Sequence, residues 1–201
     1  MLLSVLATAY LLEILGRASG AFSLTPWLAL IPARILGGEV QRLLTYPLLT
    51  GGLLELIFTG ILVGWIGSRV ERAWSAGELL FYCGLCVLGA GLVRTALAPS
   101  GAEAVAGAPV LTLALLVAWA RLFGHERLRL SSAWEIRRLH VAAVLALLVL
   151  FSAYAAAGWK HAALFAASAL TGWFYLSLRW KRNQSQPAAP VRSDRIHRLE
   201  L

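Results

Sequence analysis

The feature that most constrains this chain is a series of apolar stretches that carry almost no charge and are long enough to cross a bilayer. A membrane-spanning helix needs about 20 mainly apolar residues to cross a hydrocarbon core of ~30 Å. Only 14% of the residues are charged, whereas soluble domains average about 25%. The stretches are continuous and rich in leucine and alanine rather than alternating, which favours helices over a transmembrane β-barrel. The sequence therefore predicts an all-α, polytopic membrane protein.

Six spans are predicted, and together they form one membrane domain, residues 1–180. The first span, Met1–Leu15, is short and has no positive charge at its start, which argues against a secretory signal peptide. The sequence Ala18-Ser19-Gly20-Ala21 would nevertheless suit cleavage, so a retained helix is favoured and a signal peptide is the alternative. The other spans are predicted at Leu49–Gly67, Leu79–Ala98, Gly107–Phe123, Leu139–Ala157 and His161–Leu178.

Two segments lie outside the predicted spans. Residues 17–46 form a semi-apolar connector with Pro26 and Pro32, which is expected to lie at the outer membrane surface, and residues 181–201 form a polar tail that is expected to be disordered. Most lysines and arginines fall in the tail and in the loops on its side, so the positive-inside rule places both termini in the cytoplasm. The bare six-helix core without a targeting segment favours a bacterial plasma (inner) membrane.

The same rule accounts for the net charge of +8. No recognition motif accompanies this charge, so no nucleic-acid partner is predicted, and the lipid bilayer is the partner that the composition requires. Cys83 and Cys86 lie within an apolar stretch without further ligands nearby, so they are interpreted as small buried residues and no metal or other cofactor is predicted. Ser168 and Gly172 have the small-residue spacing that lets helices pack closely in lipid.

The segment from Gly38 to Gly60 carries a resemblance to a known family. It begins Gly-Glu-Val-Gln-Arg-Leu-Leu-Thr, passes through Gly51-Gly52, and the pattern continues to Val70-Glu71-Arg72. This resembles the rhomboid family of intramembrane serine proteases, which typically has Gly-Glu-x-Trp-Arg-Leu-Leu-Thr followed by a stretch ending in His-Gly-Gly. The resemblance implies a six-helix bundle with a long outward first loop, in agreement with the topology that the charges predict.

The resemblance also implies where catalytic groups would lie. In the family a serine at the start of the fourth helix is the nucleophile, a histidine on the sixth helix is the general base, and a His-x-x-x-Asn pair on the second helix helps to stabilise the oxyanion. Carried onto this chain, the nucleophile position falls on Ala108, the second-helix pair falls on Glu55 and Thr59, and the base falls on His161. Loss of the nucleophile of a serine hydrolase lowers the rate about 10⁶-fold. The expected protein is therefore a catalytically inactive pseudoprotease.

Three functions compete at this stage. The favoured one is a rhomboid-like scaffold that binds transmembrane segments of client proteins. The alternative is an active intramembrane serine protease that uses Ser100, in Pro99-Ser100-Gly101-Ala102, together with His161. The weakest is a small transporter or channel that uses Glu55 and His161. Because an ionisable group within a span is costly, Glu55 is expected to face a water-filled cavity that opens outward, to be protonated, or to pair with an arginine.

Overall fold

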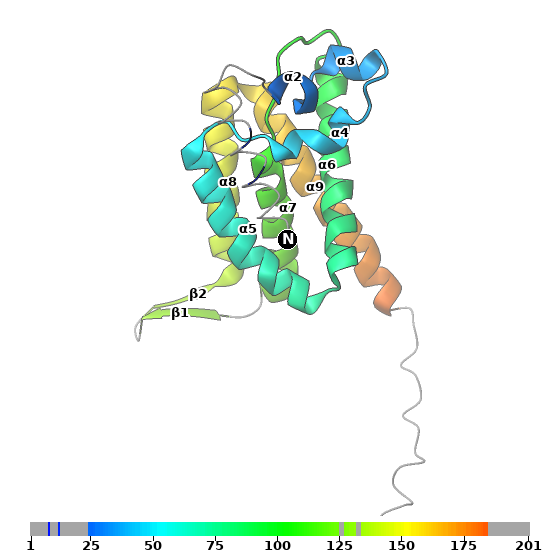
Figure 1. Ribbon diagram of the computed structural model, residues 1–201. Coiled ribbons are helices and arrows are strands. Elements are labelled where there is room, and N and C mark those ends of the chain that lie inside the picture. The colour runs from blue at the N-terminus through cyan, green and yellow to red at the C-terminus, as the bar shows by residue number, and fades with distance from the viewer. Residues whose placement is uncertain (1–7, 9–11, 13–23, 125–126, 132–133, 185–201) are drawn as a thin grey trace, which may run out of the picture.

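Five long helices and a set of short ones make up most of the described chain (Figure 1). A computed structural model describes residues 24–124, 127–131 and 134–184, together with the isolated positions Thr8 and Leu12. In chain order its elements are α2 (Thr25–Leu28), α3 (Pro32–Leu36), α4 (Arg42–Thr45), η1 (Tyr46–Leu48), α5 (Leu53–Ala73), α6 (Ala76–Leu97), α7 (Ala108–Phe123), β1 (Arg127–Ser131), β2 (Trp134–Arg137), α8 (Arg138–Ala157) and α9 (Trp159–Gln184).

The long helices correspond to the predicted spans from Leu49 onward. Within the described residues, α5, α6, α8 and the Trp159–Arg179 part of α9 are each long and apolar enough to cross a membrane. The fifth long helix, α7, is also apolar but has only 16 residues. A multi-pass helical bundle is thus confirmed. The predicted first span, Met1–Leu15, lies outside the described residues except at Thr8 and Leu12, so a total of six spans stays a prediction.

Several helix ends differ from the prediction: α5 runs on to Ala73 rather than Gly67, and α6 begins at Ala76 rather than Leu79. Two other differences have clear local causes. The helix α5 begins at Leu53 rather than Leu49 because Gly51 and Gly52 favour non-helical backbone. The helix α9 runs on to Gln184 instead of ending at Leu178, since arginine, lysine and glutamine are good helix formers. An ion pair between Arg179 and Glu78 of α6 holds this extension against the bundle. The predicted tail therefore begins within α9, and residues 185–201 lie outside the described chain.

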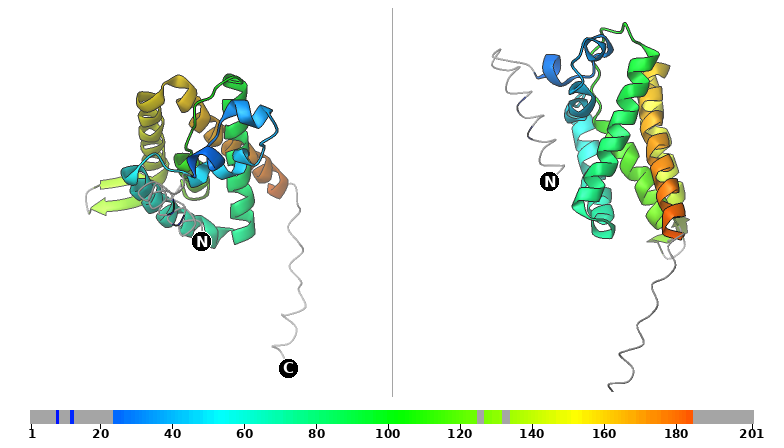
Figure 2. Two further views of the ribbon diagram at one scale, coloured as in Figure 1. Left: turned by 45° about the horizontal axis from the view of Figure 1, so that its top comes forward. Right: turned by 90° about the vertical axis from the view of Figure 1, so that its right-hand side faces the viewer.

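The loop after α7 contains a β-hairpin, which the all-α prediction did not include. The strands β1 and β2 are antiparallel and pair Arg127 with Arg137 and Leu128 with Ile136. Arg-Leu-Arg-Leu-Ser alternates polar and apolar residues with a period of two, which is the pattern of a strand rather than a helix. The hairpin projects from the end of the bundle opposite the short helices (Figures 1 and 2).

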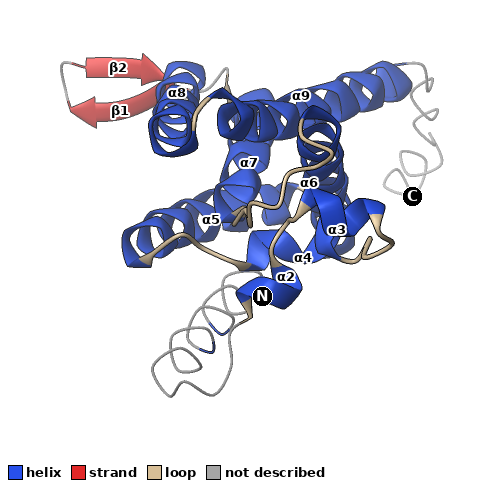
Figure 3. Cartoon of the chain, turned by 90° about the horizontal axis from the view of Figure 1, so that it is seen from above, coloured by secondary structure: helices blue, strands red, loops and turns tan. Residues whose placement is uncertain are grey.

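The helix α7 lies in the middle of the bundle, as the view from above shows (Figure 3). It packs against α5, α6, α8 and α9, and most of its side chains are buried. The hydroxyl of Tyr82 in α6 donates a hydrogen bond of 2.7 Å to the carbonyl of Ala114 in α7. The hydroxyl of Ser168 in α9 donates one of 2.9 Å to the carbonyl of Val110. These bonds satisfy buried polar groups that lipid could not.

Small residues bring α6 and α9 close together, as their spacing predicted for Ser168 and Gly172. A Cβ on Gly172 would lie 2.4 Å from the hydroxyl oxygen of Tyr82 and 3.2 Å from the sulfur of Cys86. Gly89 of α6 faces Thr171 in the same way, with 2.4 Å between an added Cβ and the Thr171 hydroxyl. Helix association in lipid depends on such packing because there is no hydrophobic driving force between helices there.

Candidate functional site

The connector between residues 24 and 52 lies across one end of the bundle, where α6 ends and α7 begins (Figures 2 and 3). Its central anchor is Arg42, whose side chain is 1% exposed. The guanidinium pairs with Glu39 at 2.5 Å and donates hydrogen bonds to the carbonyls of Ala29, at 3.0 Å, and Pro26, at 2.6 Å. Buried charges are stable in proteins only when they are paired in this way. The Glu39–Arg42 pair therefore gives the Gly-Glu-x-x-Arg motif a structural role.

Tyr46 anchors the connector in the bundle, because its side chain is completely buried there. Its hydroxyl donates a hydrogen bond of 3.0 Å to the carbonyl of Val87 in α6, and its own carbonyl accepts one from the N–H of Gly107. Burial raises the pKa of the Tyr46 phenol far above its usual range, so the phenol remains a donor at any physiological pH. The ring packs so tightly on Gly107 that an added Cβ would lie 2.1 Å from a ring carbon.

A backbone bridge closes the connector over the start of α7. Leu30 and Val105 exchange two hydrogen bonds, of 3.1 and 3.0 Å, and the N–H of Ala33 donates to the carbonyl of Gly101. Ala108 lies beneath this bridge as the first residue of α7; its side chain is completely buried, and its N–H donates to the carbonyl of Leu49. The position that the resemblance assigns to a nucleophile therefore holds a methyl group inside a packed core.

The second-helix positions lie in the first two turns of α5. The carboxylate of Glu55 accepts a hydrogen bond from the backbone N–H of Gly51, and its Oε2 would be 2.8 Å from a Cβ built on that glycine. An acidic residue in the first turn of a helix complements the helix dipole. Glu55 is thus favourably placed at the start of α5, a placement that sequence reasoning did not foresee. Thr59 is completely buried, and its hydroxyl has no hydrogen-bond partner within the described chain.

His161 lies half-buried in the first turn of α9, where its ring meets the ring of Phe165 edge-on at 5.2 Å. No hydrogen bond among the described residues joins it to Ala108, Glu55 or Thr59. Its electrostatic neighbours are Arg94 at the end of α6 and Glu103 in the loop that follows. The charged groups nearest in effect to His161 are therefore one cation and one anion.

Arg94 is the residue of this region that sequence reasoning missed. It is 2% exposed, and one guanidinium nitrogen lies 3.4 Å from a carboxylate oxygen of Glu103. Its Nε and Nη1 atoms have no hydrogen-bond partner in the described part of the chain. A cation in the last turn of a helix is stabilised by the helix dipole. The signal in the sequence was a single arginine within the otherwise uncharged stretch that forms most of α6.

Ser100, the alternative nucleophile, lies in an exposed turn between α6 and the Val105 bridge, and α7 begins only at Ala108. Glu103 lies in the exposed loop between α6 and α7. No hydrogen bond within the described residues connects Ser100 to His161. Across all the residues that the structure describes, no group of three His, Cys, Asp or Glu side chains could bind a metal ion.

A family model described as "Eukaryotic integral membrane protein (DUF1751)" matches residues 1–195 of the chain. No curated protein matches it. The match confirms an integral membrane protein, but the predicted bacterial plasma membrane is wrong, because this family is described as eukaryotic. That prediction relied on a bare helical core and on the absence of a targeting segment, neither of which depends on the kind of cell.

Proposed function

Since the chain belongs to the DUF1751 family of eukaryotic integral membrane proteins, we propose that it is a rhomboid-like membrane protein without proteolytic activity that binds transmembrane segments of other proteins. The observation that carries the proposal is Ala108, at the start of the central helix. A serine hydrolase needs a hydroxyl that a base can deprotonate and fixed donors for the oxyanion. The buried methyl group of Ala108 supplies no hydroxyl, and Glu55 places a carboxyl group where a donor would be needed.

The binding part of the proposal is supported by the way α5 is packed. This helix contacts α7 along its length but touches α6 only slightly, and it has no extensive contact with α8. Its other face is apolar and exposed, which a second helix could cover as well as lipid does. The exposed side chains of this face are Leu53, Leu54, Ile57, Phe58, Ile61 and Trp65.

A crosslinking experiment tests client binding. A photoreactive residue at Ile61 of α5, which is 64% exposed, should capture defined single-span proteins that are co-expressed in eukaryotic membranes. The matched control is Leu92 of α6, which is 56% exposed and equally apolar. Capture at Ile61 should exceed capture at Leu92 at least several-fold. Equal capture at both positions would show that clients meet this protein only by diffusion in the membrane. No capture at Ile61 would show that this face of α5 binds no client.

A serine-directed fluorophosphonate probe separates the proposed function from the alternative protease. The purified protein in detergent should remain unlabelled beside an active rhomboid protease, because the exposed hydroxyl of Ser100 lacks a base within hydrogen-bond reach among the described residues. Circular dichroism would establish that the unlabelled protein is helical. Labelling that disappears in a Ser100→Ala variant would instead mean that this chain is an enzyme.

A further inference from the structure

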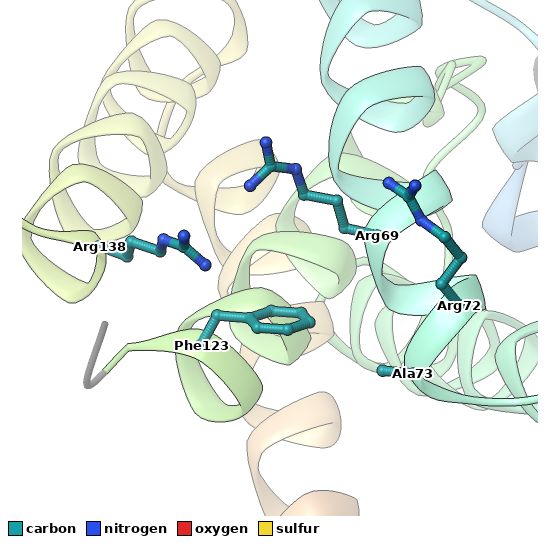
Figure 4. Close-up of a pocket in the computed structure, with 5 residues that line it drawn as sticks. All are labelled: Arg69, Arg72, Ala73, Phe123 and Arg138. Atoms are coloured by element: carbon teal, nitrogen blue, oxygen red, sulfur yellow. The ribbon is translucent and has the colours of Figure 1, made fainter. Parts of the chain in front are cut away.

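At the end of the bundle opposite the connector, three arginines line a pocket between α5, α7 and α8 (Figure 4). Arg69 and Arg72 come from the last turns of α5, Arg138 begins α8, and Phe123 ends α7. The pocket has a volume of about 460 Å³ and is wide open to its surroundings. Arg69 and Arg138 reach toward each other across it, with Phe123 beneath them (Figure 4).

Two of the three arginines that line the pocket, Arg69 and Arg72, have no counter-ion within the described chain. Among the described residues, no acidic side chain lines the pocket. The closest partners of these two arginines are neutral: the Arg69 guanidinium lies 5.0 Å from the centre of the Trp65 ring, and the Nε of Arg72 donates to the carbonyl of Ser68. The guanidinium groups of Arg69 and Arg72 thus keep most of their N–H donors available for an anion.

The position of the pocket along the helices indicates the kind of anion. Arg69 and Arg72 close an apolar span of α5 and Arg138 opens the span of α8, so the guanidinium groups lie where a bilayer changes from hydrocarbon to headgroups. Further into the membrane, Ile61 on α5 and Val144 on α8 are exposed and apolar, as contact with acyl chains requires. Basic pockets between spans on the arginine-rich side of a membrane protein suit phospholipid headgroups.

We propose that this pocket binds the headgroup phosphate of an anionic phospholipid. The planar guanidinium group matches two phosphate oxygens at once, so Arg69 and Arg72 can hold one headgroup between them. Such a lipid would join α5 to α8, two helices that pack on each other little, at their arginine-rich ends. The proposal does not depend on whether the outward end of the protein is catalytic or binds clients.

The test measures binding of phosphatidylserine to the whole protein in phosphatidylcholine nanodiscs by native mass spectrometry. The double variant Arg69→Gln/Arg72→Gln should lose about tenfold or more in apparent affinity. The matched control is the double variant Arg121→Gln/Arg179→Gln, which removes the same two charges from side chains that bond to Ser177 and Glu78 and do not line the pocket. Its binding should be unchanged. An equal loss in both variants would overturn the proposal, since binding would then follow net charge alone.

Two further measurements distinguish a site for an anionic lipid from other kinds of site. Ala73→Glu places an acid in the exposed lining of the same pocket, and it should weaken binding even if the arginine variants fold poorly. Inorganic phosphate at matched concentration should not displace the lipid, because it lacks acyl chains. Full displacement by phosphate would identify a site for free anions, and equal retention of phosphatidylcholine would identify an unselective apolar groove; either result would refute a site for an anionic lipid.

Discussion

The Arg42→Ala variant should unfold at a markedly lower temperature than the parent protein, with a loss of about 3 kcal/mol in the free energy of unfolding. The substitution removes a buried guanidinium that holds Glu39 and the carbonyls of Ala29 and Pro26 together. The buried carbonyl of Ala29 would lose its donor, and the carbonyl of Pro26 would keep only the exposed Arg34. The measurement is thermal unfolding in a mild detergent, in which the fraction of protein that stays monodisperse is recorded at each temperature.

Arg34→Ala is the control for this experiment. Arg34 donates a hydrogen bond of 3.2 Å to the same carbonyl of Pro26, but its side chain is exposed. Loss of an exposed hydrogen bond costs about 0.5–1 kcal/mol at most. If the two variants lost the same stability, the burial of Arg42 would not matter, and the connector would not be anchored through it.

Gly107→Ala is the second substitution with a large expected effect. The new Cβ would lie 2.1 Å from a carbon of the Tyr46 ring, so either the ring or the start of α7 must move. Overpacking of a core costs about 1–3 kcal/mol and sometimes more. Because Tyr46 also bonds to Val87 of α6, the movement should spread through the connector and the helix ends that it covers. Thermal unfolding would show the loss, and limited proteolysis of the connector would show its release.

Gly77→Ala serves as the comparison, because nothing lies within 4 Å of a Cβ at this exposed position in the first turn of α6. It should leave stability unchanged or raise it by up to about 1 kcal/mol, since alanine is the better helix former. A double variant, Gly107→Ala with Tyr46→Ala, should be less destabilised than the sum of its two single changes. Additive losses would mean that Tyr46 and Gly107 are not in the contact described.

The spans were predictable from the sequence because length and apolarity alone decide them. The stretch Leu139–Ala157 became α8 with its end unchanged, and Gly107–Phe123 became α7 with a shift of one residue. Boundaries moved where local chemistry intervened, at the glycines before α5 and at the polar helix formers that extend α9. The hairpin after α7 was missed although Arg127–Ser131 alternates polar and apolar residues, because the arginines there were interpreted only as topology signals.

The candidate site was predictable only as a list of positions. The sequence places Ala108 at a helix start, but it does not show that Tyr46 and the Leu30–Val105 bridge close over that start. Glu55 was expected to face an outward water-filled cavity, to be protonated or to pair with an arginine; the hydrogen bond between its carboxylate and the backbone of Gly51 was not foreseen, and its role stays a prediction. Such contacts join residues far apart in the chain or depend on the rotamer of one side chain. Contacts of these two kinds produce no periodic pattern in the sequence from which they could be predicted. The roles of Ala108, Thr59, His161 and Ser100 stay predictions.

The packing of α9 has a consequence for how the protein is made. Among the described helices, α9 is the last to leave the ribosome, yet it packs against α6, α7 and α8. Until it arrives, Val110 of α7 lacks the hydroxyl of Ser168, and Tyr82 of α6 lacks the close approach of Gly172. The earlier helices therefore wait in the bilayer with their inner faces exposed to lipid and to one another. A chain that ends prematurely before Trp159 would present those faces to the quality-control machinery of the membrane in which it is synthesised.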